Sequence, residues 1–163
     1  MALENLRDVF NEQMKDIYSA EKQLSEAMPD LIKAVSSPKL KKALESHLDE
    51  TNRHMETVRQ MLDEMDVNPG NTKCDAMAGL VKEARSMANE DGDSVARDAG
   101  IICAAQKAEH YEIATYGSLR AWARVLGEDD YASTLNSLLD EEYEADDKLS
   151  KIAEEWLNEK ASS

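Results

Sequence analysis

Four long segments of this chain repeat apolar residues at intervals of three, four or seven positions, which places them on one face of an α-helix. The segments run from Leu3 to Val35, Lys39 to Met65, Val95 to Leu126 and Asp129 to Lys160. Only three prolines and six glycines occur in 163 residues. Alanine, leucine, glutamate, lysine and methionine, which all favour helices, are abundant. The sequence therefore predicts an all-α protein.

Short turn signals separate the predicted helices. Residues 36–38 form a turn in which Ser37 is a candidate N-cap, and residues 68–71 end the second helix. A shorter helix is expected at Asp75–Asn89, and Pro29 is expected to kink or interrupt the last turns of the first helix. No domain boundary is visible, so residues 1–163 are expected to form a single domain. Two helical hairpins joined by a long crossover are typical of a ferritin-like four-helix bundle, here with an extra short helix between helices 2 and 3.

The charge of the chain argues against several classes of partner. It has 34 acidic and 19 basic residues, a formal net charge of −15, so nucleic acid and anionic membranes would be repelled. No run of about 20 apolar residues is long enough to cross a bilayer, and Met1–Phe10 does not have the pattern of a signal peptide. Cys74 and Cys103 match no metal or redox motif and are expected to be reduced thiols. These features indicate a cytoplasmic protein.

Each long helix carries one glutamate on or beside its apolar stripe: Glu21, Glu50, Glu109 and Glu142. One such acid would mean little in so acidic a chain, because surface acids also keep a protein soluble. Four buried carboxylates that converge on one core would repel each other, and a buried unpaired charge is costly. Two divalent cations would remove this cost, and hard oxygen ligands suit iron or manganese. The pattern therefore predicts a dinuclear iron or manganese site.

Further ligands are suggested by a weak internal repeat. His54 follows Glu50 by four residues, and Asp146 follows Glu142 by four, so the members of each pair share a helix face. Dimetal carboxylate bundles use a glutamate from two helices and a Glu-x-x-His pair from two others. In both pairs here the two residues are four positions apart instead of three, and the second pair ends in aspartate instead of histidine. The identity of these outer ligands therefore stays open.

His47 and Glu112 are second candidates for the same positions. His47 shares a face of its helix with His54, and it is either a ligand or a hydrogen-bonded core histidine. Glu112 follows Glu109 by one turn and could bridge the metals or replace Glu109 as a ligand. His110 is expected to be a surface or helix-packing residue. Three tyrosines are expected to be packing residues, although a tyrosine near a metal can also form a hydrogen bond to a ligand or carry oxidising equivalents: Tyr18, Tyr111 and Tyr116.

Four segments around these residues resemble the bacterial YciF/YciE stress proteins. They are DIYSAEKQL (16–24), HLDET (47–51), EHYEIATYG (109–117) and LDEE (139–142). The resemblance extends over nearly the whole chain and is most specific around Glu109. It implies a ferritin-like fold, a homodimer and a role linked to stress, but no established reaction.

Two functions fit this pattern. In the first, the protein is a dimetal oxidoreductase related in chemistry to rubrerythrins or manganese catalases, and it acts on peroxide or oxygen. Only two cysteines are present, so a redox-active protein would need an external electron donor. In the second, it is a non-enzymatic structural or metal-sequestering stress protein. Neither of these two functions identifies catalytic residues in the sequence. The apolar side chains of Trp122 and Trp156 are expected on the surface, where they would favour a helical partner.

Overall fold

The computed structural model describes residues 3–163, and within that range every regular element is helical. Met1 and Ala2, which belong to the predicted domain and to the N-terminal segment judged unlike a signal peptide, lie outside the described residues. The elements are α1 (Leu6–Ala34), α2 (Pro38–Glu64), α3 (Asp75–Ala88), α4 (Ser94–Val125), α5 (Asp129–Ile152), the π-helix η1 (Ala153–Leu157) and α6 (Asn158–Ala161). The predicted all-α fold is confirmed.

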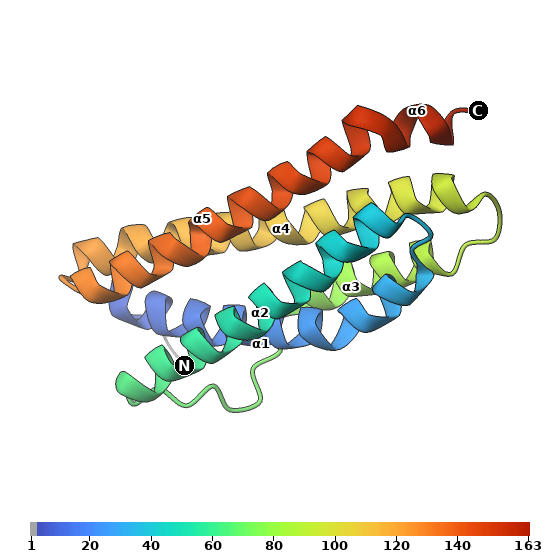
Figure 1. Cartoon of the computed structure of the whole chain (residues 1–163). Coiled ribbons are helices and arrows are strands. Elements are labelled where there is room, and N and C mark those ends of the chain that lie inside the picture. Colours follow the sequence, from blue (N-terminus) through green and yellow to red (C-terminus); the bar gives the residue numbers. More distant parts are fainter. Residues whose placement is uncertain (1–2) are drawn as a thin grey trace.

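The long helices pack as two antiparallel hairpins, α1 with α2 and α4 with α5 (Figure 1). Further contacts of α1 with α4 and of α2 with α5 close the four helices around one core. The short helix α3 lies in the crossover between the hairpins and packs against α1 and α4. This is the predicted four-helix bundle with an extra helix between the second and third long helices. Its core is continuous from Phe10 at one end to Ile152 at the other.

Side-chain caps set where the helices begin. Asn5 accepts a hydrogen bond from the backbone of Asp8, and Asp8 bonds back to Asn5, so α1 starts at Leu6 rather than at the predicted Leu3. Ser37 caps α2 as predicted, with its hydroxyl accepting from the backbone N–H of Leu40. The other predicted boundaries agree with the observed ones to within one residue, except at the C-terminus. There the predicted single helix contains the π-helical turn η1 before α6.

Pro29 does not interrupt α1, which continues through five further residues to Ala34. The expectation of an interrupted helix was wrong because this residue is exposed. Its ring lies on the outer side of the helix, where water can bond the carbonyl group that loses its N–H partner. The tight turn after α1 is held from another helix. Asp98 of α4, which is fully buried, accepts hydrogen bonds from the backbone N–H groups of Ser36 and Ser37.

The remaining expectations for the surface have mixed outcomes. Trp156 is 46% exposed, and the ammonium of Lys160 lies 4.5 Å above its ring. Trp122, by contrast, is half-buried and packs against the core, because α4 is covered on more than one side. Cys74 and Cys103 are free thiols. Among residues 3–163, no helix has the length and apolar character needed to cross a membrane.

Candidate metal centre

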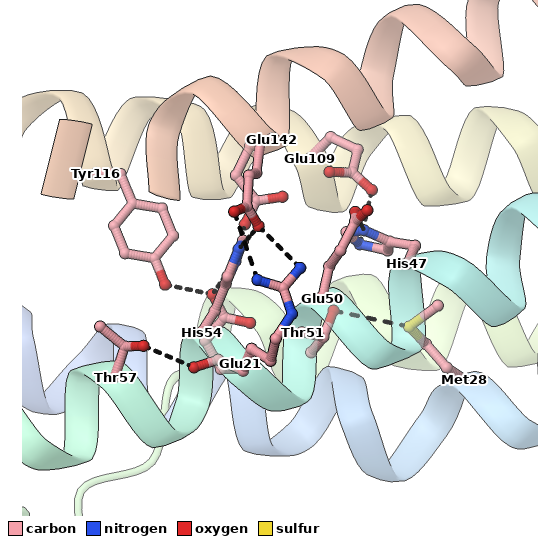
Figure 2. Close-up of polar contacts among 12 residues, drawn as sticks. Glu21, Met28, His47, Glu50, Thr51, His54, Thr57, Glu109, Tyr116 and Glu142 are labelled. Carbon is pink, nitrogen blue, oxygen red and sulfur yellow. Dashed lines mark hydrogen bonds and ion pairs between the residues drawn. The ribbon is translucent and has the colours of Figure 1, made fainter. Parts of the chain in front are cut away.

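Carboxylates and imidazoles from all four long helices meet in the middle of the bundle (Figure 2). Glu21 comes from α1, Glu142 from α5, and Glu109 and Glu112 from α4; at most 1% of each of these residues is exposed. Helix α2 contributes two histidines, of which His47 is 7% exposed and His54 is fully buried. The two are seven residues apart, or about two turns, so both rings point from one face of α2 into the core.

One group of possible ligands contains His47, Glu109, Glu112 and Glu142. Each residue offers an atom that lies within 4.8 Å of those of the other three. The closest contact that involves the imidazole joins Nε2 of His47 to Oε1 of Glu109 at 2.9 Å. Neither ring nitrogen of His47 has a partner in hydrogen-bonding geometry. The arrangement therefore presents an imidazole and three carboxylates, which is a ligand set suited to iron or manganese.

A second group contains Glu21, His54 and Glu142, again with ligand atoms within 4.8 Å of one another. Nδ1 of His54 lies 2.8 Å from Oε1 of Glu142 and 3.8 Å from Oε1 of Glu21. The hydroxyl of Tyr116 donates a short hydrogen bond to that same oxygen of Glu21, which fixes the carboxylate in place (Figure 2). Glu142 belongs to both groups, so the two groups share one carboxylate.

Glu50 lies at the edge of this cluster rather than within it. Its Oε2 atom is 3.6 Å from Nδ1 of His47, its Oε1 atom is 3.9 Å from the ammonium of Lys148, and its side chain is 18% exposed. Glu50 is absent from both groups, so as the side chains stand it contacts a possible ligand, His47, without converging on the others.

Asp146 is directed away from the cluster. It accepts a hydrogen bond from the amide of Gln106 at 3.0 Å, and its second oxygen lies 3.2 Å from Nε2 of His110. The side chain of His110 is 67% exposed, in agreement with the expected surface position. Asp146 thus belongs to a polar contact between α4 and α5 on the outside of the bundle, apart from the residues that converge in the core.

Burial and mutual repulsion raise the pKa values of the core carboxyl groups. Burial, and then the charge of Glu142, raise the pKa of Glu21 to about 7. Burial also raises the pKa of Glu142 to about 7, although the hydrogen bond from His54 acts in the opposite direction. The pKa of Glu112 is well above its usual value, first through burial and then through the charges of Glu142 and Glu21. Without a cation, the cluster therefore holds protons at neutral pH.

The histidine pKa values are raised as well. Burial lowers the pKa of His54, but the hydrogen bond to Glu142 and the nearby carboxylate charges outweigh it and bring the value to about 9. Burial acts in the same way on His47, and the charge of Glu109 reverses it, so that the pKa is well above the usual range. The raised pKa values favour the protonated, cationic form of both rings when no metal is bound. The protons stand in for part of the positive charge that metal ions would supply.

Several buried atoms of the cluster nevertheless have no hydrogen-bond partner. They are five carboxylate oxygens and two imidazole nitrogens: Glu21 Oε2, Glu109 Oε2, Glu112 Oε1 and Oε2, Glu142 Oε2, and Nδ1 and Nε2 of His47. Buried polar groups are nearly always bonded, so a concentration of exceptions in one place needs an explanation. Metal coordination would supply one, because each of these atoms is a possible ligand.

Sequence reasoning undervalued three residues. Glu112 was only a second candidate but is as deeply buried as Glu142. Tyr116 was expected to pack, yet its hydroxyl is the donor to Glu21; its position one turn after Glu112 was the available signal. Glu141 was not among the candidate site residues, but its Oε2 atom lies 2.7 Å from Nε2 of His54. Nothing in the helical pattern indicated that contact, since it depends on how α2 and α5 are rotated.

Comparisons with known proteins agree with this architecture. The chain is 40% identical to protein YciF of Escherichia coli (strain K12) over 164 aligned residues, which cover 100% of this chain and 99% of that protein. The crystal structure of the E. coli stress protein YciF matches with a TM-score of 0.89 and 41% identity, covering 93% of this chain and 96% of that one.

Two other solved structures are similar. YcfI of Rhodopseudomonas palustris, described as a candidate structural protein, matches with a TM-score of 0.86 and 39% identity over 90% of this chain and 94% of that one. A protein from Xanthomonas campestris pv. campestris matches with a TM-score of 0.68 and 25% identity, over 96% and 90%. The family model described as "Domain of unknown function (DUF892)" matches residues 5–162. On the evidence of that match and of the full-length identity to YciF, the chain belongs to the DUF892 family.

Proposed function

We propose that the protein binds two divalent iron or manganese ions in the core of the bundle, with Glu142 bridging them. The observation that carries the proposal is that Glu142 belongs to both groups of convergent ligands. In this arrangement His47, Glu109 and Glu112 would hold one ion together with Glu142, and Glu21 and His54 would hold the other. Glu50 is close enough to His47 to become a further ligand after a side-chain rotation.

The chemistry of the donor set fits such ions. The residues offer carboxylate oxygens and imidazole nitrogens, which bind a metal ion once the rings release their extra protons, and no thiolate takes part in either group. Four glutamates, Glu21, Glu109, Glu112 and Glu142, carry four negative charges when ionised, which balance two divalent cations. The seven buried atoms without hydrogen-bond partners would coordinate a metal ion or form hydrogen bonds to water bound to the metal. Metal binding would thus remove both the repulsion and the unpaired polar atoms at once.

The protein's own residues would control what happens at the centre. An iron or manganese pair, when bound, supplies a redox couple able to exchange electrons with peroxide or oxygen. Tyr116 orients Glu21 through its hydroxyl, and Glu141 orients the ring of His54 through Nε2. Burial of the cluster excludes bulk water. With only two cysteines in the chain, a four-cysteine electron-transfer site is lacking, so electrons would come from an external donor.

The relatives support a stress-linked role for this chain. The similar E. coli protein is described as a stress protein, and we extend that role to this chain as part of the proposal. We further propose that the protein acts in the cytoplasm as a homodimer, with the exposed Trp156 in or near the contact between the copies. Neither nucleic acid nor an anionic membrane suits the net charge of −15.

The second candidate function is that of a non-enzymatic structural or metal-sequestering stress protein. It is favoured by the contacts of His54, which lies between Glu141 and Glu142 at hydrogen-bonding distance from both and so neutralises part of the cluster without metal. The description of the R. palustris relative as a candidate structural protein points the same way.

Metal analysis distinguishes these functions. Protein purified without chelator, then stripped and reloaded anaerobically with iron(II) or manganese(II), should retain two ions per chain after desalting. Two ions that cycle between oxidation states with peroxide or oxygen support the oxidoreductase. Two ions without turnover support sequestration. If neither metal is retained, the dinuclear proposal fails and the structural role remains.

A further inference from the structure

A narrow apolar cavity reaches the candidate metal centre from the side covered by α3. It has a volume of about 20 Å³, and its inner end is formed by His47 and Glu109, which belong to the first ligand group. All its other lining residues are leucine, methionine, valine or alanine. The only side-chain nitrogen and oxygen atoms along the cavity are therefore those at the metal centre itself.

Helix α3 forms the outer wall of this cavity. Its residues Met77, Leu80, Val81 and Ala84 face α1 and α4, whose contributions include Leu24, Met28, Ala104 and Ala108. The start of α3 is held on α1 by two hydrogen bonds: the backbone N–H of Cys74 donates to Ser19, and Gln23 donates to the carbonyl of Cys74. These bonds anchor the start of the wall to α1.

The mouth of the cavity can be located from exposure. Of its lining residues only Leu80 and Ala105 are half-buried, and the rest are buried. These two lie on α3 and α4, which pack side by side (Figure 1). An entrance on this side would lead to His47 and Glu109 along apolar side chains. Met28, another lining residue, has its sulfur 3.9 Å from the hydroxyl of Thr51 on α2 (Figure 2).

The size and lining of the cavity select what can enter. A cavity of about 10–15 Å³ holds one water molecule, so this one has room for a molecule only slightly larger. Water in the apolar part of the cavity would lose its hydrogen bonds, so that part stays dry, and only next to His47 and Glu109 does a water molecule find polar partners. An ion or a strongly polar molecule would meet the same cost. A small uncharged apolar molecule would not.

A second, smaller cavity reaches the same residues from between α2 and α5. It has a volume of about 10 Å³ and is also formed in part by His47 and Glu109, but its lining includes the polar residues Ser46, Glu50 and Lys148. At that volume it holds no more than about one water molecule, which can bond those polar side chains. The apolar cavity under α3 is therefore the larger of these two approaches to His47 and Glu109.

We propose that the apolar cavity under α3 is the binding and access site for a small uncharged apolar molecule, of which dioxygen is the type, on its way to the metal centre. The inference rests on the proposed function for its destination, but the cavity itself does not depend on bound metal. The apolar lining favours entry of dioxygen over entry of a charged or strongly polar oxidant on this side of the centre.

Xenon tests the cavity in metal-free protein, because this gas occupies dry apolar cavities. Methyl NMR spectra of the full chain, recorded in chelator under xenon pressure, should show saturable shifts for Leu24, Leu44 and Val81. Ala105→Leu, which narrows the mouth, and Ala104→Leu, which narrows the wall, should each abolish those shifts. Ala114→Leu, an exposed site on the same helix, is the matched control and should keep them.

The metal-loaded protein gives a second readout. Two iron(II) ions would give one electron each to a dioxygen molecule, which with two protons leaves as hydrogen peroxide. Ala105→Leu should slow this oxidation roughly tenfold, equivalent to about 1.4 kcal/mol, without changing the amount of iron(II) bound anaerobically. Absence of saturable xenon binding in the wild type would overturn the cavity proposal and leave the metal site standing. Failure of iron to bind would instead refute the proposed metal centre, while the xenon experiment would still test whether the cavity binds a small apolar molecule. If one variant does not fold, the other decides the comparison.

Discussion

Replacing Glu142 with glutamine should remove most of the stability that metal ions give to this protein. Glu142 is the one residue shared by the two groups of ligands, and it is fully buried. Glutamine has nearly the same size but carries no charge and cannot bridge two cations through two oxygens. The change should therefore weaken the binding of both ions, whereas Glu112→Gln should weaken mainly the binding of the ion near His47.

The expected magnitudes follow from mass action. At a free metal concentration of 100 times the dissociation constant, one site adds about 2.7 kcal/mol to the free energy of unfolding. Two independent sites would add about 5.4 kcal/mol. For a chain of this length each kcal/mol raises the melting temperature by about 2–4 °C, so two ions correspond to about 11–22 °C. Glu142→Gln should lose most of that rise and Glu112→Gln about half.

Differential scanning calorimetry of stripped protein, with and without manganese(II), measures this rise for each variant. The comparison uses the rise and not the melting temperature itself, because removing a buried charge also changes the metal-free protein. Glu45→Gln, at an exposed position on α2, is the matched control and should retain the full rise. The reasoning is refuted if the wild type gains no stability from iron(II) or manganese(II), or if Glu142→Gln gains as much as the control.

Three further outcomes are expected. The folded-state pKa values of Glu21, Glu142 and His54 are all raised, so the metal-free fold binds more protons than the unfolded chain and should lose stability as the pH rises from about 5 to 9. Thermal melts in chelator check this, and a melting temperature that increases across the window would contradict it. Tyr116→Phe removes the donor to Glu21 and should lower the free energy of unfolding in chelator by about 1–3 kcal/mol in urea titrations; no change would mean that the bond contributes nothing. Light scattering should give about twice the chain mass, and Trp156→Ala should shift the protein toward monomer; a wild-type monomer at micromolar concentration would count against the dimer.

The fold could be predicted because its signals are local. Apolar periodicity, the cap at Ser37 and the turn after Met65 each depend on a few neighbouring residues, and together they leave little choice of topology. The predictions about helix continuity were wrong where the outcome depends on the surroundings of a residue in the folded protein. Pro29 is tolerated since it faces solvent, and the π-helical turn at Ala153–Leu157 alters the last helix without a glycine or proline to announce it.

The candidate site was predictable only in part, because ligands depend on how each helix is rotated about its axis. Glu21, Glu109 and Glu142 lie in the centre of their apolar faces, so burial alone placed them. Asp146 follows Glu142 by four residues, which turns it about 40° around α5. That rotation is enough to direct it to Gln106 on α4 instead of the core.

The same reasoning explains why α2 contributes histidines rather than Glu50 to the centre. His47 and His54 are seven residues apart, a separation that differs by only about 20° from two full turns. Both rings therefore share the innermost line of the helix, while Glu50 lies beside it and stays 18% exposed. The seven-residue spacing of the histidines is visible in the sequence, but the Glu-x-x-His pattern of dimetal bundles favours Glu50 and His54 instead.

The partnerless atoms of the cluster bear on the choice between a metal centre and a purely structural core. An unsatisfied buried donor or acceptor costs about 1–3 kcal/mol. The five carboxylate oxygens among them would then cost about 5–15 kcal/mol, as much as the whole stability of an ordinary domain. Protonation of the carboxylates reduces this cost, but when the pH rises and the protons are lost, the carboxylates repel one another. A bundle selected only to be stable would replace these residues with aliphatic ones, as at the neighbouring Leu139 and Ala108. The cost is understandable if a cation repays it, which is why loss of metal-dependent stability in Glu142→Gln is the decisive observation.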